Sequence, residues 1–299
     1  MADTTFRCGF VAIAGRPNVG KSTLINAMVG HKVSIVSPKP QTTRHRVLGI
    51  RNSDTAQLIF VDTPGIHSGG KRVLNRRMNR SASSAIADAD IVLMMVEALR
   101  WTEQDDWVLR QCVQSGRPLG LIINKVDILH GRTQLLPYLQ ELQGKADFLF
   151  MVPISAEHRD NLDELEKQIV QHLPESPPLF PREQVTDQTQ AARAAEFIRE
   201  QLMLALQQEV PYSVAVQVDE FSDEPKLLRI GATIWVERDG QKAIVIGHGG
   251  ELLKKIGRGA RLELQKVFGK KVFLQLWVKV RQNWADDERA LRQFGIEDT

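Results

Sequence analysis

The sequence predicts an α/β protein with two domains, of which the first holds a mostly parallel sheet and the second is smaller and α+β. Three observations support this. A length of 299 residues favours two domains of ~150 residues each. Short apolar runs alternate with helical patterns over the first half, as in a parallel sheet covered on both faces. Four prolines in nine residues, 173–181, then favour an extended linker. We therefore expect a first domain at 1–173, a linker at 174–189 and a second domain at 190–299.

The first domain is expected to contain five strands of the parallel type, each followed by a helix. Apolar runs predict the strands at 10–14, 55–61, 91–96, 119–124 and 148–154. Helical spacing predicts helices at 22–29, 75–87, 103–114, 135–142 and 162–172. The run at 47–50 is expected to pair antiparallel with 55–61 at the edge of the sheet.

The second domain follows another order. We expect a helix at 190–208, two strands at 212–220 and 228–238, and a short helical segment at 242–246. A glycine-rich loop, a helix at 251–267, a strand at 272–280 and a short final helix at 286–294 complete it.

The composition indicates a protein of the cytoplasm. An apolar fraction of 42% and a charged fraction of 25% are ordinary for a soluble chain. The two cysteines, Cys8 and Cys112, argue against a disulfide framework or a zinc site and suggest a reducing compartment. Residues 1–7 lack the pattern of a signal peptide, and no apolar run is long enough to span a bilayer.

Residues 15–22, GRPNVGKS, fit the phosphate-binding loop pattern. The loop lies between an apolar run and a helical pattern, which is the context that the motif needs. Backbone amides and the positive end of the helix would face the phosphates. Lys21 would reach the β- and γ-phosphates, and the Ser22 hydroxyl would ligate Mg²⁺. The loop predicts a nucleoside triphosphate without specifying its base.

Residues 62–65, DTPG, follow the predicted strand 55–61. Asp62 would hold Mg²⁺ through water, and the Gly65 amide would meet the γ-phosphate. A plain turn is the alternative, because Asp, Pro and Gly all favour turns. The position after the phosphate loop favours the functional interpretation.

Residues 124–127, NKVD, predict that the base is guanine. The Asp127 carboxylate can accept hydrogen bonds from guanine N1–H and N2–H₂, a donor pair that adenine lacks. Asn124 would tie this loop to the phosphate loop, and the Lys125 stem would cover the base. Backbone amides of Ser155, Ala156 and Glu157 would contact guanine O6.

Residues 41–44, QTTR, lie in a polar stretch where a threonine would complete the Mg²⁺ shell. Thr42 and Thr43 are both candidates. Loss of that contact on hydrolysis would release the segment, as in a nucleotide switch. An ordinary threonine-rich loop is the alternative.

The second domain carries a basic excess and a Gly-x-x-Gly loop. Between residues 242 and 281 ten residues are basic and only Glu251 and Glu263 are acidic, which suits a polyanion. The loop at 247–250, GHGG, lies between two helices, as in KH domains, where it clamps about four single-stranded nucleotides. A simple turn and a solvated helix face are the alternatives. The predicted RNA contacts are Gly247, His248, Gly249, Gly250, Lys254, Lys255 and Arg258.

The first domain, with its motifs in this order, resembles the translation-factor-related GTPases of the small G-protein (P-loop) fold. The second resembles a type II KH domain. Together the motifs at 15–22, 41–46, 62–65, 124–127, 247–250 and 284–291 resemble the Era family over essentially the whole chain. The motifs and the resemblance together predict the following GTP contacts: Gly15, Arg16, Pro17, Asn18, Val19, Gly20, Lys21, Ser22, Thr23, Asp62, Thr63, Pro64, Gly65, Asn124, Lys125, Asp127, Ser155, Ala156 and Glu157.

This resemblance implies hydrolysis of GTP with Mg²⁺ and a KH domain that grips the 3′ end of small-subunit (16S) ribosomal RNA. It also implies a role in 30S subunit biogenesis and a cytoplasmic protein that partly associates with the inner membrane. We expect a monomer. Two other classes stay open: a membrane or stress switch whose basic surface meets anionic lipid, and an RNA chaperone with a vestigial GTPase.

The expected catalytic groups are Lys21, Asn18 and Gly65. Ile66 stands where Ras-like proteins carry a water-orienting glutamine, and its side chain cannot hydrogen-bond water. Hydrolysis is therefore expected to be slow or to rely on another group. In some relatives an asparagine in the phosphate loop helps to hold a K⁺ that acts like an arginine finger, and we carry this role to Asn18 as a hypothesis.

Overall fold

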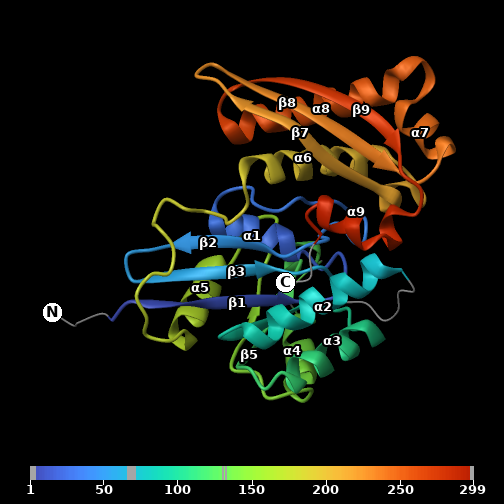
Figure 1. Ribbon diagram of the computed structural model, residues 1–299. Coiled ribbons are helices and arrows are strands. Elements are labelled where there is room, and N and C mark those ends of the chain that lie inside the picture. Colours follow the sequence, from blue (N-terminus) through green and yellow to red (C-terminus); the bar gives the residue numbers. More distant parts are fainter. Residues whose placement is uncertain (1–4, 66–71, 130, 132, 297–299) are drawn as a thin grey trace.

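The computed structural model describes residues 5–65, 72–129, 131 and 133–296. Figure 1 shows two sheets, one above the other, with helix α6 between them. The lower sheet has the strand order β2-β3-β1-β4-β5-β6, and only the β2–β3 pair is antiparallel. Its strands are β1 (Arg7–Ala14), β2 (Val47–Asn52), β3 (Ala56–Asp62), β4 (Ile91–Glu97), β5 (Leu119–Asn124) and β6 (Met151–Pro153).

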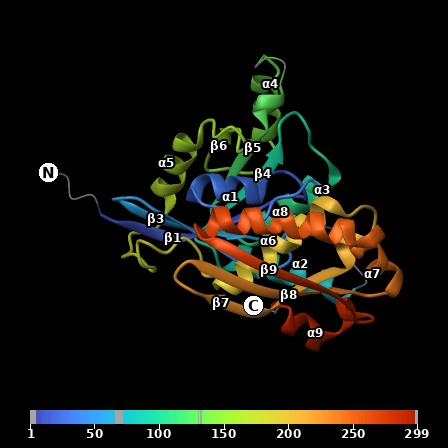
Figure 2. The ribbon, with the colours of Figure 1, turned by 90° about the horizontal axis from the view of Figure 1, so that it is seen from above.

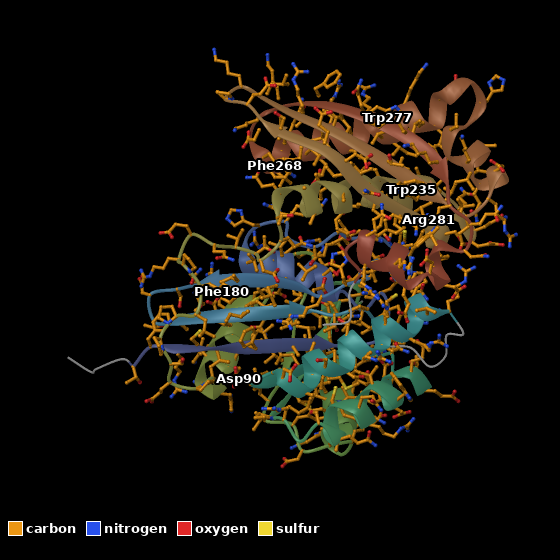
Figure 3. All side chains as sticks on the ribbon, in the orientation of Figure 1. Asp90, Phe180, Trp235, Phe268, Trp277 and Arg281 are labelled. Carbon is orange, nitrogen blue, oxygen red and sulfur yellow. The ribbon has the colours of Figure 1, made fainter. Side chains whose placement is uncertain are left out.

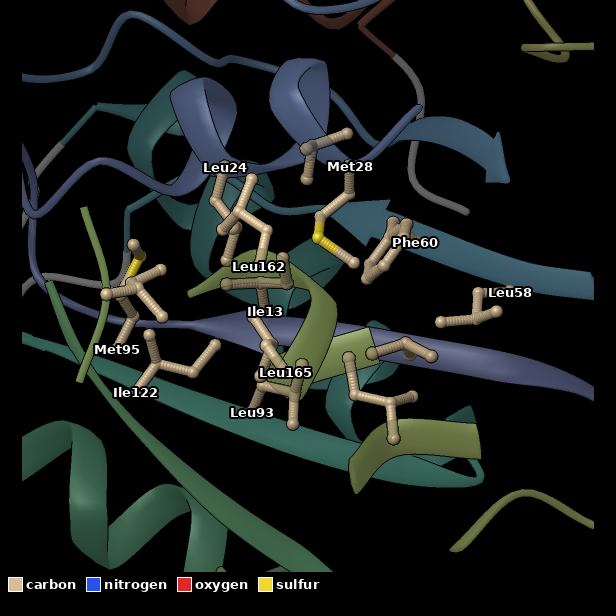
Figure 4. Packing of buried hydrophobic residues seen from close by; sticks show 14 of the residues in the cluster. Ile13, Leu24, Met28, Leu58, Phe60, Leu93, Met95, Ile122, Leu162 and Leu165 are labelled. Atoms are coloured by element: carbon tan, nitrogen blue, oxygen red, sulfur yellow. The ribbon is translucent and has the colours of Figure 1, made fainter. Parts of the chain in front are cut away.

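Helices cover both faces of this sheet, as its apolar strands require. Helices α1 (Lys21–Val29) and α5 (Leu162–His172) pack on one face. Helices α2 (Val73–Asp88), α3 (Glu103–Gln114) and α4 (Leu135–Gln143) pack on the other. Figure 4 shows the first of these two cores, where Leu24 and Met28 of α1 meet Phe60 and Ile13 of the strands.

The upper sheet has the order β7-β8-β9, with β7 antiparallel and β9 parallel to β8. Helices α6 and α8 pack on one face, and Figure 2 shows α8 crossing above α6. The elements are α6 (Gln190–Ala205), β7 (Val214–Asp223), β8 (Leu227–Val236), α7 (Asp239–Ile246), α8 (Glu251–Phe268), β9 (Lys271–Val280) and α9 (Glu288–Gln293). The predicted class, a mostly parallel α/β domain followed by an α+β domain, is confirmed.

The proline-rich segment between the sheets is extended, and it is also fixed to the first domain. The Cys8 amide donates to the Pro174 carbonyl at 3.2 Å, and the Ile50 amide donates to the Val185 carbonyl at 2.9 Å. The Gln57 side chain accepts from the amides of Leu179 and Phe180. Figure 3 shows Phe180 beside β2 and β3, where it packs against their apolar residues. The segment therefore limits where the upper domain can lie.

Several boundaries differ from those that the sequence predicts. Strand β6 spans only three residues of the expected 148–154. Helix α6 ends at Ala205, three residues early, because the next residue, Leu206, is extended with a ψ of 158°. Strand β7 begins at Val214, because a 3-10 turn with Pro211 occupies residues 210–213. The final helix is divided, because the Asp287 side chain caps α9 after a 3-10 turn at Trp284–Asp286.

None of the helices in the described part of the chain is long and apolar enough to cross a bilayer.

Candidate GTP and RNA sites

The phosphate loop joins β1 to α1 in the close-packed form that its glycines allow. Gly20 has a φ of +107°, and a Cβ there would lie 2.4 Å from the Asn124 amide nitrogen. A Cβ at Gly15 would lie 2.6 Å from the Met95 carbonyl oxygen. Both positions therefore need glycine. The Arg16 side chain pairs with Glu97 and Asp105, so only the backbone of Arg16 remains for a phosphate.

The Lys21 ammonium lies within the loop at the start of α1. It donates to the carbonyl oxygens of Gly15 at 2.9 Å and Arg16 at 3.2 Å. Burial lowers the pKa of Lys21 to about 8, although the nearby Asp62 charge opposes this. A buried ammonium with only carbonyl partners is poised to exchange them for phosphate oxygens.

Three oxygen-bearing side chains meet beside the loop. The Ser22 hydroxyl donates to Asp62 Oδ2 at 2.8 Å, and the Thr43 hydroxyl lies 3.1 Å from Ser22 Oγ and 3.3 Å from the same carboxylate oxygen. Asp62 Oδ1 is buried and has no hydrogen-bond partner among the residues that the structure describes. Burial raises the pKa of Asp62, and the hydrogen bond from Ser22 and the charge of Lys21 oppose it. An unpartnered carboxylate oxygen beside two hydroxyls fits Mg²⁺, which prefers hard oxygen ligands.

The neighbouring Thr42 is arranged differently. Its hydroxyl donates to the Lys39 carbonyl at 2.6 Å and lies 2.7 Å from Ser37 Oγ. Its hydroxyl is therefore engaged within its own loop. Of the two threonines that the sequence left open, Thr43 lies next to Ser22 and Asp62.

Residues 62–65 lie against the phosphate loop. The Thr63 hydroxyl donates to the Ile13 carbonyl at 3.0 Å, and Pro64 is buried. A Cβ at Gly65 would lie 3.2 Å from Pro17 Cα, so the two backbones are in close contact. One pocket lies between this loop, the phosphate loop and the segment after α1. Its lining residues are Pro17, Asn18, Gly20, Lys21, Ser22, Thr23, Ile35, Val36, Ser37, Lys39, Gln41, Thr42, Thr43 and Gly65. Ile66, from which we expect slow intrinsic GTP hydrolysis, lies outside the described residues.

The base-reading loop is tied to the phosphate loop through Asn124, as the sequence leads us to expect. The Asn124 amide donates to the Val19 carbonyl at 2.8 Å, and its oxygen accepts from the Ala156 amide at 2.9 Å. Lys125 has a φ of 65° and begins the 3-10 turn that carries Asp127. The Asp127 side chain is 23% exposed, and its carboxylate lies 3.8 Å from His158 Nε2.

The amides of residues 155–156 already have protein partners. The Ser155 amide donates to the Asp160 carbonyl at 3.2 Å, and the Ala156 amide donates to Asn124. A contact of these amides, or that of the exposed Glu157, with guanine O6 stays a prediction. For Ser155 and Ala156 it requires a shared or exchanged hydrogen bond.

Asn18 faces the segment that follows α1. It has a φ of 66°, and its amide donates to the Pro38 carbonyl at 2.8 Å. An amide oxygen and a carbonyl oxygen thus stand at the junction of the phosphate loop and residues 35–43.

The Gly-x-x-Gly loop joins α7 to α8. Gly247, Gly249 and Gly250 have positive φ values of 72°, 56° and 81°. A Cβ would meet nothing within 4 Å at Gly249 or Gly250, and His248 is exposed, so the loop presents an open backbone. A groove runs from this loop between α8 and the edge strand β9. Its lining residues are Gly250, Leu253, Lys254, Gly257, Arg258, Arg261, Leu274 and Leu276. Lys255 is exposed on the same helix.

Sequence reasoning missed the residues that connect the two sites. Arg44 is only 3% exposed, and its guanidinium donates to the carbonyl oxygens of Val214 at 2.6 Å, Pro211 at 3.0 Å and Tyr212 at 3.2 Å. Burial, reinforced by the Arg199 charge, lowers the pKa of Arg44 to about 9. Arg199 of α6 donates to the Thr42 carbonyl, and the Lys39 ammonium donates to carbonyls at the end of α6. Residues 39–44 are therefore held by the upper domain.

Helix α2 also contacts the upper domain. Its Leu74 and Met78 share an apolar cluster with Trp284, Leu291 and Ile296, and Figure 1 shows α9 beside α2. Trp284 is fully buried and thereby docks the C-terminal tail. No local sequence pattern indicates that Trp284 packs against α2.

Comparison with known proteins agrees with these sites. Residues 10–125 match the model of the 50S ribosome-binding GTPase family, and residues 209–285 match the KH domain. GTPase Era of Stenotrophomonas maltophilia is 51% identical over 98% of this chain and 99% of its own. GTPase Era of Pseudomonas syringae pv. tomato is 49% identical over the full length of both chains.

Two solved structures have the same fold over 97% of this chain and 99% of theirs, each with a TM-score of 0.94 and 42% identity. One is a variant of Aquifex aeolicus Era bound to GDP and AlF4⁻. The other is Era in complex with MgGDPNP and nucleotides 1506–1542 of 16S ribosomal RNA. The chain belongs to the Era family of GTPases.

Proposed function

We propose that this protein is a GTP-controlled clamp for the 3′ end of small-subunit ribosomal RNA and that it acts in 30S subunit biogenesis. Residues 1–173 bind and hydrolyse GTP, and residues 190–299 hold the RNA. The observation that carries the proposal is the direct contact of residues 39–44, beside the nucleotide pocket, with the KH domain. The Era–RNA complex supports the identity of the partner.

At the phosphates, Lys21 exchanges its carbonyl partners for β- and γ-phosphate oxygens. Ser22, Thr43 and Asp62 would hold Mg²⁺, which neutralises charge on the bridging oxygens when bound. The Gly65 amide contacts the γ-phosphate and reports its presence. At the other end of the nucleotide, Asp127 selects guanine and Lys125 covers it.

The nucleotide state reaches the RNA through residues 39–44 and α2. When GTP binds, Thr43 moves toward the metal. The next residue, Arg44, donates to backbone carbonyls of the KH domain and transmits this movement. Loss of the γ-phosphate releases this segment and changes its hold on the KH domain. Coupling between two sites is reciprocal, so RNA also changes GTP affinity.

RNA occupies the groove that starts at Gly247 and follows α8. The open glycine backbone lets phosphates approach closely, and Lys254, Lys255 and Arg258 neutralise them. Leu274 and Leu276 offer apolar surface to the bases.

Asn18 together with the Pro38 carbonyl would supply oxygen ligands to a K⁺ beside the β–γ bond. Such a cation compensates for Ile66, which cannot orient water. The proposal predicts faster GTP hydrolysis in KCl than in NaCl for the natural chain, and equal rates for Asn18→Ala. Equal rates in both salts for the natural chain contradict it.

We also propose a cytoplasmic monomer with peripheral association with the inner membrane. The exposed cations of α8 would meet anionic lipid. Sedimentation with anionic and neutral vesicles at low and moderate salt tests this. Absence of binding to both vesicle types rules out the membrane part alone.

The proposal is tested most simply by crosslinking the GTP-bound protein to cellular RNA and reading the crosslinked sequence. We expect the 3′ end of 16S ribosomal RNA. A spread over unrelated RNAs contradicts the assigned partner and favours a general chaperone.

A sharper form replaces His248 and Gly249 with Asp. Both positions are exposed, so the two carboxylates repel RNA phosphates without a clash. The matched control is Lys167→Glu, which also lowers the net charge by two but lies on the exposed face of α5. We expect the loop variant alone to lose RNA binding by about tenfold or more while GTP binding persists.

A further inference from the structure

A buried cluster of charges lies at the carboxyl end of β4 and centres on Glu97, a residue that the GTP motifs do not name. Glu97, the last residue of β4, pairs through Oε2 with Arg16 at 2.7 Å and through Oε1 with Lys125 at 3.4 Å. Its side chain is 13% exposed, and that of Arg16 is 8% exposed. One carboxylate thus holds a residue of the phosphate loop and a residue of the base-reading loop.

The strand order explains why this position can reach both loops. Strand β4 lies between β1, which leads into the phosphate loop, and β5, which leads into the base-reading loop. In register, Glu97 pairs with Asn124, the residue before Lys125. The Ala98 amide donates to the Asn124 carbonyl at 2.8 Å and keeps the two strand ends together.

The carboxylate stays charged in this place. Burial favours the neutral form of Glu97, but the hydrogen bond from Arg16 and the charges of Lys125 and Arg16 outweigh it, so the pKa of Glu97 is lowered. The anion can therefore fix the Lys125 ammonium, which is otherwise the end of a flexible chain.

We propose that Glu97 is a positioning residue for nucleotide binding. It holds Lys125 so that the stem of this lysine lies over the base before the nucleotide arrives, and it keeps the phosphate and base loops at a fixed spacing through Arg16. Pre-ordering a flexible side chain reduces the entropy lost on binding. Asp105 plays a different part, because it pairs with Arg16 and completes the capping box at the start of α3.

The inference rests on the proposed GTP site and is tested with the full chain and GDP carrying a fluorescent label on its ribose. Glu97→Gln keeps the shape and removes the charge. We expect weaker GDP binding by about fivefold, through faster release, and a KM for GTP that rises more than kcat changes. Lys125→Met should weaken GDP binding by a similar factor. The double variant should bind GDP at least as tightly as whichever single variant has the lower GDP affinity.

Arg100→Gln is the matched control. Arg100 is a third cation beside Glu97, at 3.5 Å from Oε2, but it is 63% exposed and belongs to neither loop. We expect its GDP release rate to stay within about twofold of the natural chain. Thermal unfolding without nucleotide shows whether each variant is folded.

The outcomes separate this inference from the function on which it rests. If the natural chain fails to bind GDP, the GTP site itself is wrong. If the natural chain binds and Glu97→Gln releases GDP at the same rate, the inference is wrong. Additive losses in the double variant also overturn it, because they would show that Glu97 does not act through Lys125.

Discussion

The guanidinium of Arg44 lies 5.9 Å from the ring centroid of Trp284, across the boundary between the two domains. Arg44 follows Thr43, whose hydroxyl lies 3.3 Å from the Asp62 carboxylate, and Trp284 begins the C-terminal tail. The indole of Trp284 also donates to the Ser213 carbonyl at 3.1 Å and packs in the cluster that includes Leu74 and Met78 of α2. The segment at 39–44 and helix α2 therefore both meet the KH domain at one tryptophan.

This junction predicts an asymmetry between two tryptophans. Trp284 is fully buried, whereas Trp277 on β9 is 45% exposed. Trp284→Ala should lower the free energy of unfolding by about 3–5 kcal/mol, because it leaves a cavity and an unpaired carbonyl. Trp277→Ala should lower it by about 1 kcal/mol or less. Urea denaturation measures both, and equal losses would contradict the burial of Trp284.

The lowered pKa of Lys21 predicts a pH-dependent stability cost. The folded pKa of about 8 lies below the ordinary 10.5, so between these values the unfolded chain binds more protons than the folded chain. Stability contributed by this group therefore rises with pH across that window and is lowest below pH 8. Without nucleotide, Lys21→Met should be more stable than the natural chain at pH 7, by up to about 3 kcal/mol.

The difference between the two chains should shrink as pH rises from 8 to 10. Comparing two chains at each pH cancels the other titrating groups. Denaturation at pH 7, 8, 9 and 10 provides the test. A difference that stays constant over this range would show that Lys21 is not held with a depressed pKa.

Base selection by Asp127 predicts an exchange of nucleotide preference. Asp127→Asn replaces a two-acceptor group by one acceptor and one donor, which matches the N1–H and C2 carbonyl of xanthine. GTP affinity should fall by about a hundredfold or more, and XTP should bind better than GTP. The control is Asp163→Asn, the same chemical change at an exposed position of α5, which should keep its preference for GTP. Competition against labelled GDP measures both, and an unchanged preference in Asp127→Asn would place the base elsewhere.

Local motifs account for the part of the site that the sequence predicts. Asn124, Ser22 and Asp62 stand at strand ends or a helix start, so their order along the chain fixes their meeting at one edge of the sheet. The choice between Thr42 and Thr43 needed the conformation of the loop, because adjacent residues have the same local signal. In the structure Thr42 bonds to Ser37 and Lys39, whereas Thr43 lies beside Ser22 and Asp62, and this difference favours Thr43 as the metal ligand.

Contacts between the domains could not be read from the sequence. Arg44 and Trp284 are far apart in the chain, and each looks locally like a surface arginine or a packing tryptophan. Glu97 ends an apolar strand and matches no motif, although its place between two functional loops follows from the strand order. The early end of helix α6 could not be read from the sequence for a similar reason. The carbonyl of Leu206, just after the helix, accepts from Lys39 of the other domain, and the 3-10 turn before β7 follows.

The central claim is that nucleotide state and RNA binding are coupled through residues 39–44. The most direct measurement is GTP affinity of the full chain with and without saturating RNA from the 3′ end of 16S ribosomal RNA, together with RNA affinity in the GTP-analogue and nucleotide-free states. The account predicts that both ratios are equal and about fivefold or larger, and that Arg44→Gln brings both close to one while each ligand still binds. Ratios of one in the natural chain, or full coupling in folded Arg44→Gln, would contradict it.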